Sequence, residues 1–156
     1  MTSLSIFKSM LRAAMLSLVL VSAAYAADVG TPAEAEALVK KAVALIKAVG
    51  PEKAYDEITN GKSLKNRDLY VAVNDLNGKN LAHGGNAKMV GKDIMGLKDS
   101  DGNLPTQMML AIVKEKGKGW TGEYKAMNPL TQKVQAKIAY VERVGDTFVV
   151  SGAYKN

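Results

Sequence analysis

The sequence predicts an α+β domain in which a long N-terminal helix packs on a five-stranded antiparallel sheet. Apolar residues recur at helical spacing between Thr31 and Val49, which is typical of an amphipathic helix. Short runs of β-branched and aromatic residues begin at Leu69 and alternate with turn residues, which indicates strands. With 156 residues, 47% of them apolar, the chain has the length of one domain and enough apolar side chains for a core.

Residues 1–26 have the pattern of a secretory signal peptide. Lys8 and Arg12 give a positive start, and the short apolar stretch that follows ends at Ala24-Tyr25-Ala26, a small-x-small cleavage site. Because a spanning helix needs about 20 apolar residues and this stretch is shorter, cleavage is favoured over a membrane anchor. We therefore expect a periplasmic domain that covers residues 27–156.

Three helices are predicted from their end signals. Thr31-Pro32-Ala33-Glu34 combines a capping residue, a proline at the first position and the glutamate of a capping box. Gly50 ends this helix, and Pro51 can begin a second one over Glu52–Thr59. The third is expected over Pro105–Glu115.

The first helix also carries more apolar surface than one contact with a sheet requires. If the sheet does not use all of it, we expect a weak homodimer through this helix. The apolar residues concerned are Leu38, Val39, Ala42, Val43, Leu45, Ile46 and Val49.

The five predicted strands are Leu69–Val73, Leu81–His83, Gly119–Met127, Val134–Val141 and Phe148–Tyr154. Asn77-Gly78 joins the first two as a hairpin. A two-residue turn there would pair Ala72 with His83, whereas a three-residue loop with a bulge would pair Val71 with His83. Since a slip of one residue turns a side chain to the other face, the register decides which way His83 points.

A series of short motifs supports a family resemblance. They are Leu81-Ala82-His83, Val90-Gly91-Lys92, Asp99-Ser100-Asp101-Gly102, Gly119-Trp120, Tyr124, Asn128-Pro129, Lys137 with Tyr140, and Gly152-Ala153-Tyr154. In this order and spacing they resemble the bacterial single Cache domains of type 2, over about Thr31 to Lys155. The resemblance implies an extracytoplasmic small-molecule sensor with a PAS-like sheet and a long N-terminal helix.

The residue inventory argues against an enzyme. His83 is the only histidine and there is no cysteine, so a nucleophile–histidine pair, a histidine-rich metal site and a disulfide are not expected. Asp99–Asn103 lacks the glycine and glutamate positions of an EF-hand and is expected to be a turn. We expect a binding module with no catalytic residue, metal or cofactor.

Six residues are candidates for ligand binding: Tyr70, His83, Trp120, Tyr124, Lys137 and Tyr140. Lys137 interrupts an apolar strand, so its ammonium is either solvated or paired with an anion. A solvated lysine is the commoner case, but the resemblance supports the second alternative, a pocket cation for a small carboxylate, as strongly. His83 can equally be a core histidine, and the aromatic residues can equally be core.

The expected function is therefore binding of a small organic anion, such as a short carboxylate, for sensing or capture. A membrane-bound signalling partner is expected for the sensing version. The alternative is a non-sensing structural or chaperone-like envelope protein whose pocket is filled. Nucleic acid is not an expected partner: the chain has a net charge of +6, but its short lysine runs lack interleaved aromatic residues.

Export can be tested directly. Expressed in a Gram-negative host, the protein should be recovered from the periplasm with Ala27 as its first residue, because signal peptidase cuts after a small-x-small site. N-terminal sequencing of the periplasmic fraction provides the measurement. Recovery of uncut protein in the inner membrane would contradict the prediction and favour an anchored domain.

Overall fold

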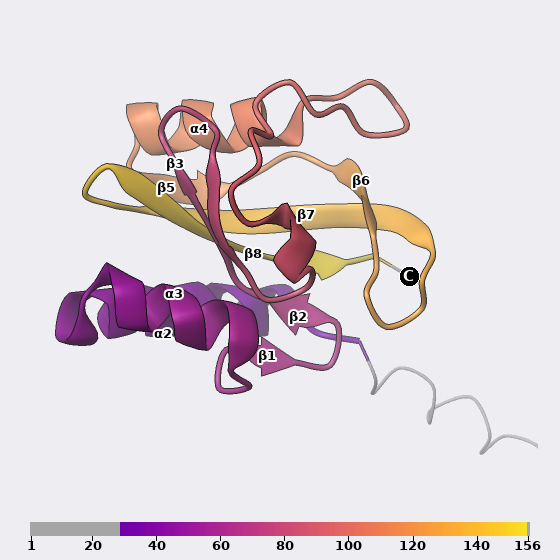
Figure 1. Cartoon of the computed structure of the whole chain (residues 1–156). Coiled ribbons are helices and arrows are strands. Elements are labelled where there is room, and N and C mark those ends of the chain that lie inside the picture. The colour runs from indigo at the N-terminus through magenta and orange to yellow at the C-terminus, as the bar shows by residue number, and fades with distance from the viewer. Residues whose placement is uncertain (1–28, 156) are drawn as a thin grey trace, which may run out of the picture.

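The computed structural model describes residues 29–155 and shows a sheet with helices on both faces (Figure 1). Helices α2 (Pro32–Val49) and α3 (Pro51–Asn60) cover one face, and α4 (Pro105–Glu115) covers the other. The α+β prediction is confirmed. The predicted signal peptide lies outside the described residues. None of the helices in residues 29–155 is long and apolar enough to cross a membrane.

The main sheet has six strands rather than the five expected. They are β3 (Ala72–Asp75), β4 (Asn80–His83), β5 (Lys118–Trp120), β6 (Tyr124–Met127), β7 (Val134–Val144) and β8 (Thr147–Tyr154). Their order is β4-β3-β8-β7-β5, all antiparallel, and β6 also pairs with β7. A separate pair is formed by β1 (Lys65–Asn66) and β2 (Leu69–Tyr70).

Two predicted strands are each divided in the structure. The strand expected over Gly119–Met127 is interrupted at Thr121, whose hydroxyl accepts a hydrogen bond from the Ala139 amide at 3.0 Å and so replaces a backbone partner. The strand expected over Leu69–Val73 changes partners at Val71, because β2 pairs with β1 while β3 pairs with β4 and β8.

The helix boundaries follow the end signals. The Glu34 amide donates to the Thr31 hydroxyl at 3.3 Å, and the Thr31 amide donates to the Glu34 carboxylate at 2.8 Å, which completes the capping box. Gly50 adopts a φ of 84° at the end of α2, a conformation that glycine tolerates best. The third helix has the predicted bounds, Pro105–Glu115.

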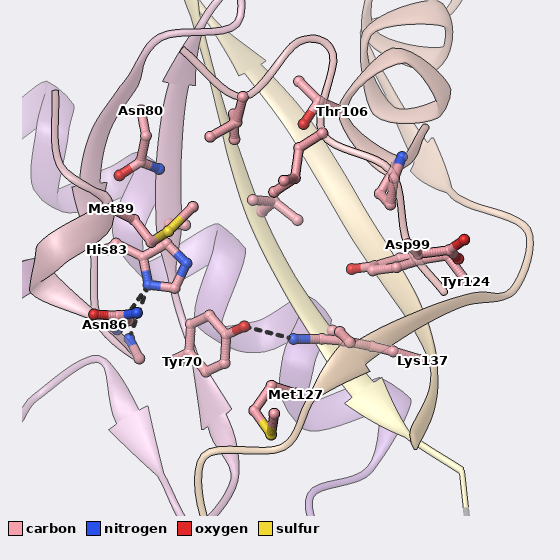
Figure 2. Close-up of a pocket in the computed structure, with 18 of the residues that line it drawn as sticks. Tyr70, Asn80, His83, Asn86, Met89, Asp99, Thr106, Tyr124, Met127 and Lys137 are labelled. Atoms are coloured by element: carbon pink, nitrogen blue, oxygen red, sulfur yellow. Dashed lines mark hydrogen bonds between the residues drawn. The ribbon is translucent and has the colours of Figure 1, made fainter. Parts of the chain in front are cut away.

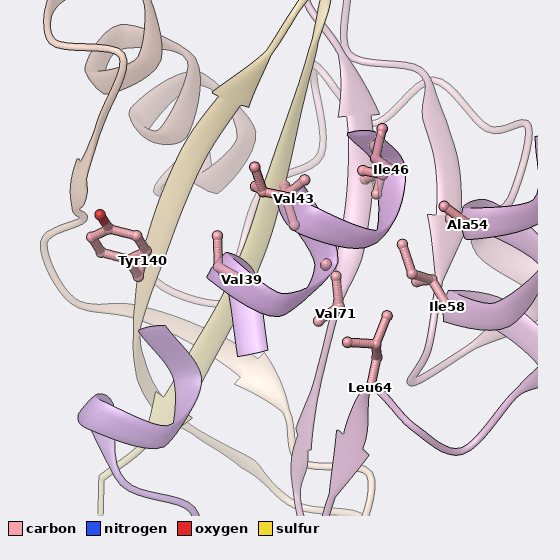
Figure 3. Packing of buried hydrophobic residues seen from close by; sticks show 12 residues of the cluster. Val39, Val43, Ile46, Ala54, Ile58, Leu64, Val71 and Tyr140 are labelled. Carbon is pink, nitrogen blue, oxygen red and sulfur yellow. The ribbon is translucent and has the colours of Figure 1, made fainter. Parts of the chain in front are cut away.

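The core between α2, α3 and the sheet uses most of the apolar surface of α2 (Figure 3). Val39, Val43 and Ile46 are buried there, and Leu38 and Leu45 pack partly buried against the same cluster. Burial of each such side chain contributes about 1.5–3 kcal/mol. The surface that suggested a dimer is thus largely consumed within the chain. The dimer remains a prediction without structural support.

The β3–β4 hairpin combines features of both predicted alternatives. The Asp75 amide donates to the Lys79 carbonyl at 2.9 Å, so the loop between them has three residues. A register shift then leaves Leu81 unpaired, and His83 lies opposite Ala72. His83 thus pairs with Ala72, as predicted for a two-residue turn. The actual loop has three residues, and the bulge at Leu81 restores this pairing.

This bulge decides which side chains share a face. Asn80 lies opposite Asn74, and His83 lies opposite Ala72. Since Ala72 and Asn74 are two residues apart on β3, both partners project to the same face. Without the unpaired residue, Asn80 and His83, three apart in sequence, would project to opposite faces.

A buried aspartate joins three parts of the chain. Asp68, in the β1–β2 turn, is 1% exposed. Its carboxylate accepts from the Gly30 amide at 2.7 Å and from the Asn128 side chain at 3.2 Å. The lead-in to α2 and the β6–β7 loop are therefore held at one point.

Candidate functional site

A cavity of about 570 Å³ lies on the α4 side of the sheet (Figure 2). Strands β2, β3, β4, β6, β7 and β8 contribute to its wall, together with the short 3-10 helix η1 (Ala87–Met89), part of residues 84–104 and the first turns of α4. A volume of this size lies within the range of about 300–1,000 Å³ that is common for small-molecule pockets.

Lys137 lies in this wall with 3% of its surface exposed. Its Nζ is 3.1 Å from the Tyr70 hydroxyl and 3.3 Å from the Tyr154 hydroxyl. It also lies 4.2 Å and 4.5 Å from the centres of these two rings, close enough for cation–π attraction. In the described part of the chain, no carboxylate forms an ion pair with it. Among residues 29–155, the ammonium is therefore buried without a carboxylate counter-ion.

The sheet places this lysine in a row of tyrosines. Tyr124 on β6 and Tyr154 on β8 lie directly opposite Lys137 on its two sides, so all three project to the same face. Gly152 leaves room for the lysine stem, because a Cβ there would lie 2.6 Å from Lys137 Cε.

The two tyrosine hydroxyls next to the Lys137 ammonium differ in whether their protons are already used in a hydrogen bond. Tyr154 accepts from Lys137 and donates to the Met127 carbonyl at 2.6 Å, so its proton is already used. Tyr70 accepts from Lys137 and hydrogen-bonds with the neighbouring Tyr154, and no backbone carbonyl in residues 29–155 takes its proton, so that proton can be donated to a ligand. Burial opposes ionisation of Tyr70, but the charge of Lys137 and the hydrogen bonds with Lys137 and Tyr154 together lower the pKa of this phenol.

His83 is fixed in one tautomer. Its Nδ1 accepts from the Asn86 amide at 2.9 Å and the Gly85 amide at 3.2 Å, so the proton of the neutral ring is on Nε2. The ring stacks on Tyr70 with 5.0 Å between centroids. Burial, together with Lys137, lowers the pKa of His83 to about 4. Near neutral pH the ring therefore presents an Nε2–H donor on its cavity side (Figure 2).

Of the six candidate residues, four line the cavity: Tyr70, His83, Tyr124 and Lys137. Trp120 and Tyr140 do not. They contact each other with ring centroids 5.4 Å apart and pack in the core beneath α2. Lys137 and Tyr140 are three residues apart on β7, so strand alternation turns them to opposite faces. Trp120 lies opposite Tyr140 and shares its face.

Residues beyond the six candidates also contribute to the site, either next to Lys137 or in the cavity wall. Tyr154 approaches Lys137 directly, and sequence alone could have identified it. A two-residue turn at Gly145-Asp146 pairs Val144 with Thr147 and, further along, Lys137 with Tyr154. Wall residues from α4 and η1, such as Thr106, Met109 and Met89, depend on how residues 84–104 fold back over the sheet. No local signal indicates that path.

Asp99 at the cavity rim has a structural role. Its carboxylate accepts from the amides of Asp101 and Asn103, from the Asn103 side chain and from the Lys125 amide, at 2.8–2.9 Å. Although burial opposes ionisation, these donors lower the pKa of Asp99 to about 2. The predicted turn over Asp99–Asn103 is thus present and attached to β6. Among the described residues no group of three or more potential metal ligands occurs.

The tautomer and pKa of His83 can be measured without ambiguity, because it is the only histidine. Its ring should titrate near pH 4 in the folded protein and near pH 6.5 in urea. The unfolded state alone then binds a proton between these values, so stability should fall as the pH drops from about 6.5 to about 4. Nuclear magnetic resonance titration of the ring checks this. A midpoint near 6.5 in the folded state would contradict it.

Comparison with known proteins agrees with this architecture. A match to the single Cache domain 2 family covers residues 5–156. A methyl-accepting chemotaxis protein from Vibrio parahaemolyticus is similar with a TM-score of 0.68 and 20% identity, over 78% of this chain and 86% of that one. A periplasmic sensor domain of a chemotaxis protein has a TM-score of 0.61 and 21% identity, over 100% of both chains.

A further solved structure, described as showing carboxylic acid recognition by a Cache chemosensory domain, has a TM-score of 0.61 and 26% identity. The similarity covers 80% of this chain and 88% of that one. A search of curated proteins found no significant match. From the family match and the shared fold, the chain belongs to the single Cache domain 2 family of ligand-binding sensor domains.

Proposed function

We propose that this domain binds a small organic anion through a carboxylate at Lys137 and serves as an exported domain for sensing or capture. The observation that carries the proposal is the ammonium of Lys137, which is 3% exposed and has no described carboxylate partner. A buried charge of this kind is costly unless it is paired. Two tyrosine rings and hydroxyls offset part of that cost, and a bound anion would supply the missing charge.

The donors around the cavity suit a carboxylate. Two N–H groups of Lys137 donate to tyrosine hydroxyls, and the third can donate to a ligand. Tyr70 can donate its hydroxyl proton, and His83 can donate from Nε2. Hydrogen bonds of this kind to an ionised acceptor are stronger than neutral ones. A carboxylate can accept all three, because each of its oxygens has two lone pairs.

Three further observations support the proposal, two for ligand binding and one for export. The solved structure described as showing carboxylic acid recognition is 26% identical over 80% of this chain. The cavity of about 570 Å³ also argues against the alternative of a non-sensing structural or chaperone-like protein with a filled pocket. For export, the support is the signal-peptide pattern of residues 1–26.

In the sensing version, a membrane-bound partner would recognise the occupied domain. Capture by itself requires no such partner. The two versions differ in one observable: cross-linking to an inner-membrane protein should depend on ligand only if the domain senses. Ligand binding without any ligand-dependent partner would favour capture.

Replacement of Lys137 by methionine tests the binding site. Lys137→Met keeps most of the apolar stem and removes the ammonium. A hydrogen bond to a charged group contributes about 1.5–3 kcal/mol, so carboxylate affinity should fall about tenfold to over a hundredfold. The empty protein should be as stable or more stable, since an unpaired buried cation is removed. Calorimetric titration with a panel of sodium monocarboxylates and thermal unfolding provide the measurements.

Lys133→Met is the matched control, because Lys133 is exposed in the β6–β7 loop and does not line the cavity. It should leave both affinity and stability nearly unchanged. Equal carboxylate affinity in the wild type and Lys137→Met would remove Lys137 from the binding site.

A further inference from the structure

We infer that the preferred ligand is a carboxylate with an apolar body, such as an aromatic ring or a chain of several methylenes, and no ammonium group. This inference rests on the proposed function, since it assumes that the carboxylate lies at Lys137. It differs from the expectation of a short carboxylate, because the remainder of the cavity is large and mostly apolar.

The polar donors occupy only part of the cavity wall. Lys137, Tyr70 and His83 lie together, and Thr106 at the start of α4 lies across the cavity from them (Figure 2). A carboxylate held by the first three residues therefore has its substituent directed into the space beneath α4.

Apolar side chains form most of the wall of that space, next to the amides of Asn74 and Asn80. Ala72 and Val150 form part of its floor on the sheet, and Met109 covers it from α4; all three are buried members of one apolar cluster. Met89 and Ile94 close it from residues 84–104. An acetate-sized ligand would leave this surface in contact with water, whereas an apolar body would cover it. Methionine side chains are flexible and fit apolar ligands of varied shape.

In the described part of the cavity wall, a ligand ammonium would find only one acidic side chain, and that carboxylate is already satisfied by hydrogen bonds. Among the described residues Asp99 is the only acidic one that lines the cavity. Its carboxylate already accepts four hydrogen bonds from Asp101, Asn103 and Lys125, which accounts for its lone pairs. Lys98 and Lys125, also on the wall, would repel a second positive charge. An amino acid is therefore a poorer ligand than the acid that lacks the amine.

A series of ligands tests the inference on the unmodified mature protein. Calorimetric titration compares acetate, butanoate and hexanoate, and then 3-phenylpropanoate with phenylalanine. Each buried methylene should strengthen binding about fourfold, so the four extra methylenes of hexanoate give about 250-fold over acetate if all are buried, and at least about fiftyfold if three are. 3-Phenylpropanoate should bind at least about tenfold more tightly than phenylalanine, since the ammonium lacks a partner.

The outcomes separate this inference from the proposed function. If acetate binds as tightly as hexanoate, the apolar-body inference fails and the carboxylate site stands. If phenylalanine binds as tightly as 3-phenylpropanoate, the exclusion of an ammonium fails. If no carboxylate in the series binds, the proposed function itself fails.

A variant locates the apolar body. Met109→Trp should narrow the space beneath α4, and so weaken hexanoate at least about tenfold while acetate affinity stays within about twofold. Ala111→Trp is the matched control, because Ala111 is exposed on the same helix and does not line the cavity. Melting temperatures confirm folding of both variants. Unchanged hexanoate affinity in a folded Met109→Trp protein would contradict the placement, and the ligand series remains decisive if that variant does not fold.

Discussion

The buried ammonium of Lys137 is the interaction on which the candidate site depends. Taking such a charge out of water is costly, and the structure meets this cost with the rings and hydroxyls of Tyr70 and Tyr154. Gly152 provides the space for the lysine stem. These contacts require the long strands β7 and β8 to be in register, so the electrostatics of the cavity follow from the pairing of one hairpin.

The cavity wall and the start of α2 belong to one hydrogen-bonded framework. Tyr154 connects Lys137 to the Met127 carbonyl. The adjacent residue, Asn128, donates to the buried Asp68, and Asp68 accepts from the Gly30 amide that leads into α2. The α4 side of the sheet thus holds the cavity, while the α2 side provides the larger apolar core that fixes the sheet. Because the core on the α2 side stabilises the sheet, the α4 side can contain a cavity that side chains do not fill.

Local signals in the sequence predicted the helices well and the site only in part. Caps and prolines act within a few residues, so the bounds of α2 and α4 followed from the sequence. Strand alternation places Tyr140 on the face opposite Lys137, so the two side chains cannot both line the cavity. The positions of His83 and Asn80 required knowledge of the bulge at Leu81, which depends on pairing between strands.

The α4 side of the cavity could not be predicted from local pattern. Residues 84–104 contain little regular structure and are placed by long-range hydrogen bonds, such as the one from the Lys125 amide to Asp99. Contacts of this kind join residues far apart in the chain, and no spacing in the sequence reports them. Thr106 and Met109 enter the site for the same reason, because α4 is carried there by that segment.

A crystal structure of the protein with bound hexanoate would show whether a carboxylate binds at Lys137. We expect one carboxylate oxygen within hydrogen-bonding distance of Lys137 Nζ and the Tyr70 hydroxyl, with His83 Nε2 donating to the carboxylate. A carboxylate bound elsewhere, with Lys137 still contacting only Tyr70 and Tyr154, would contradict it.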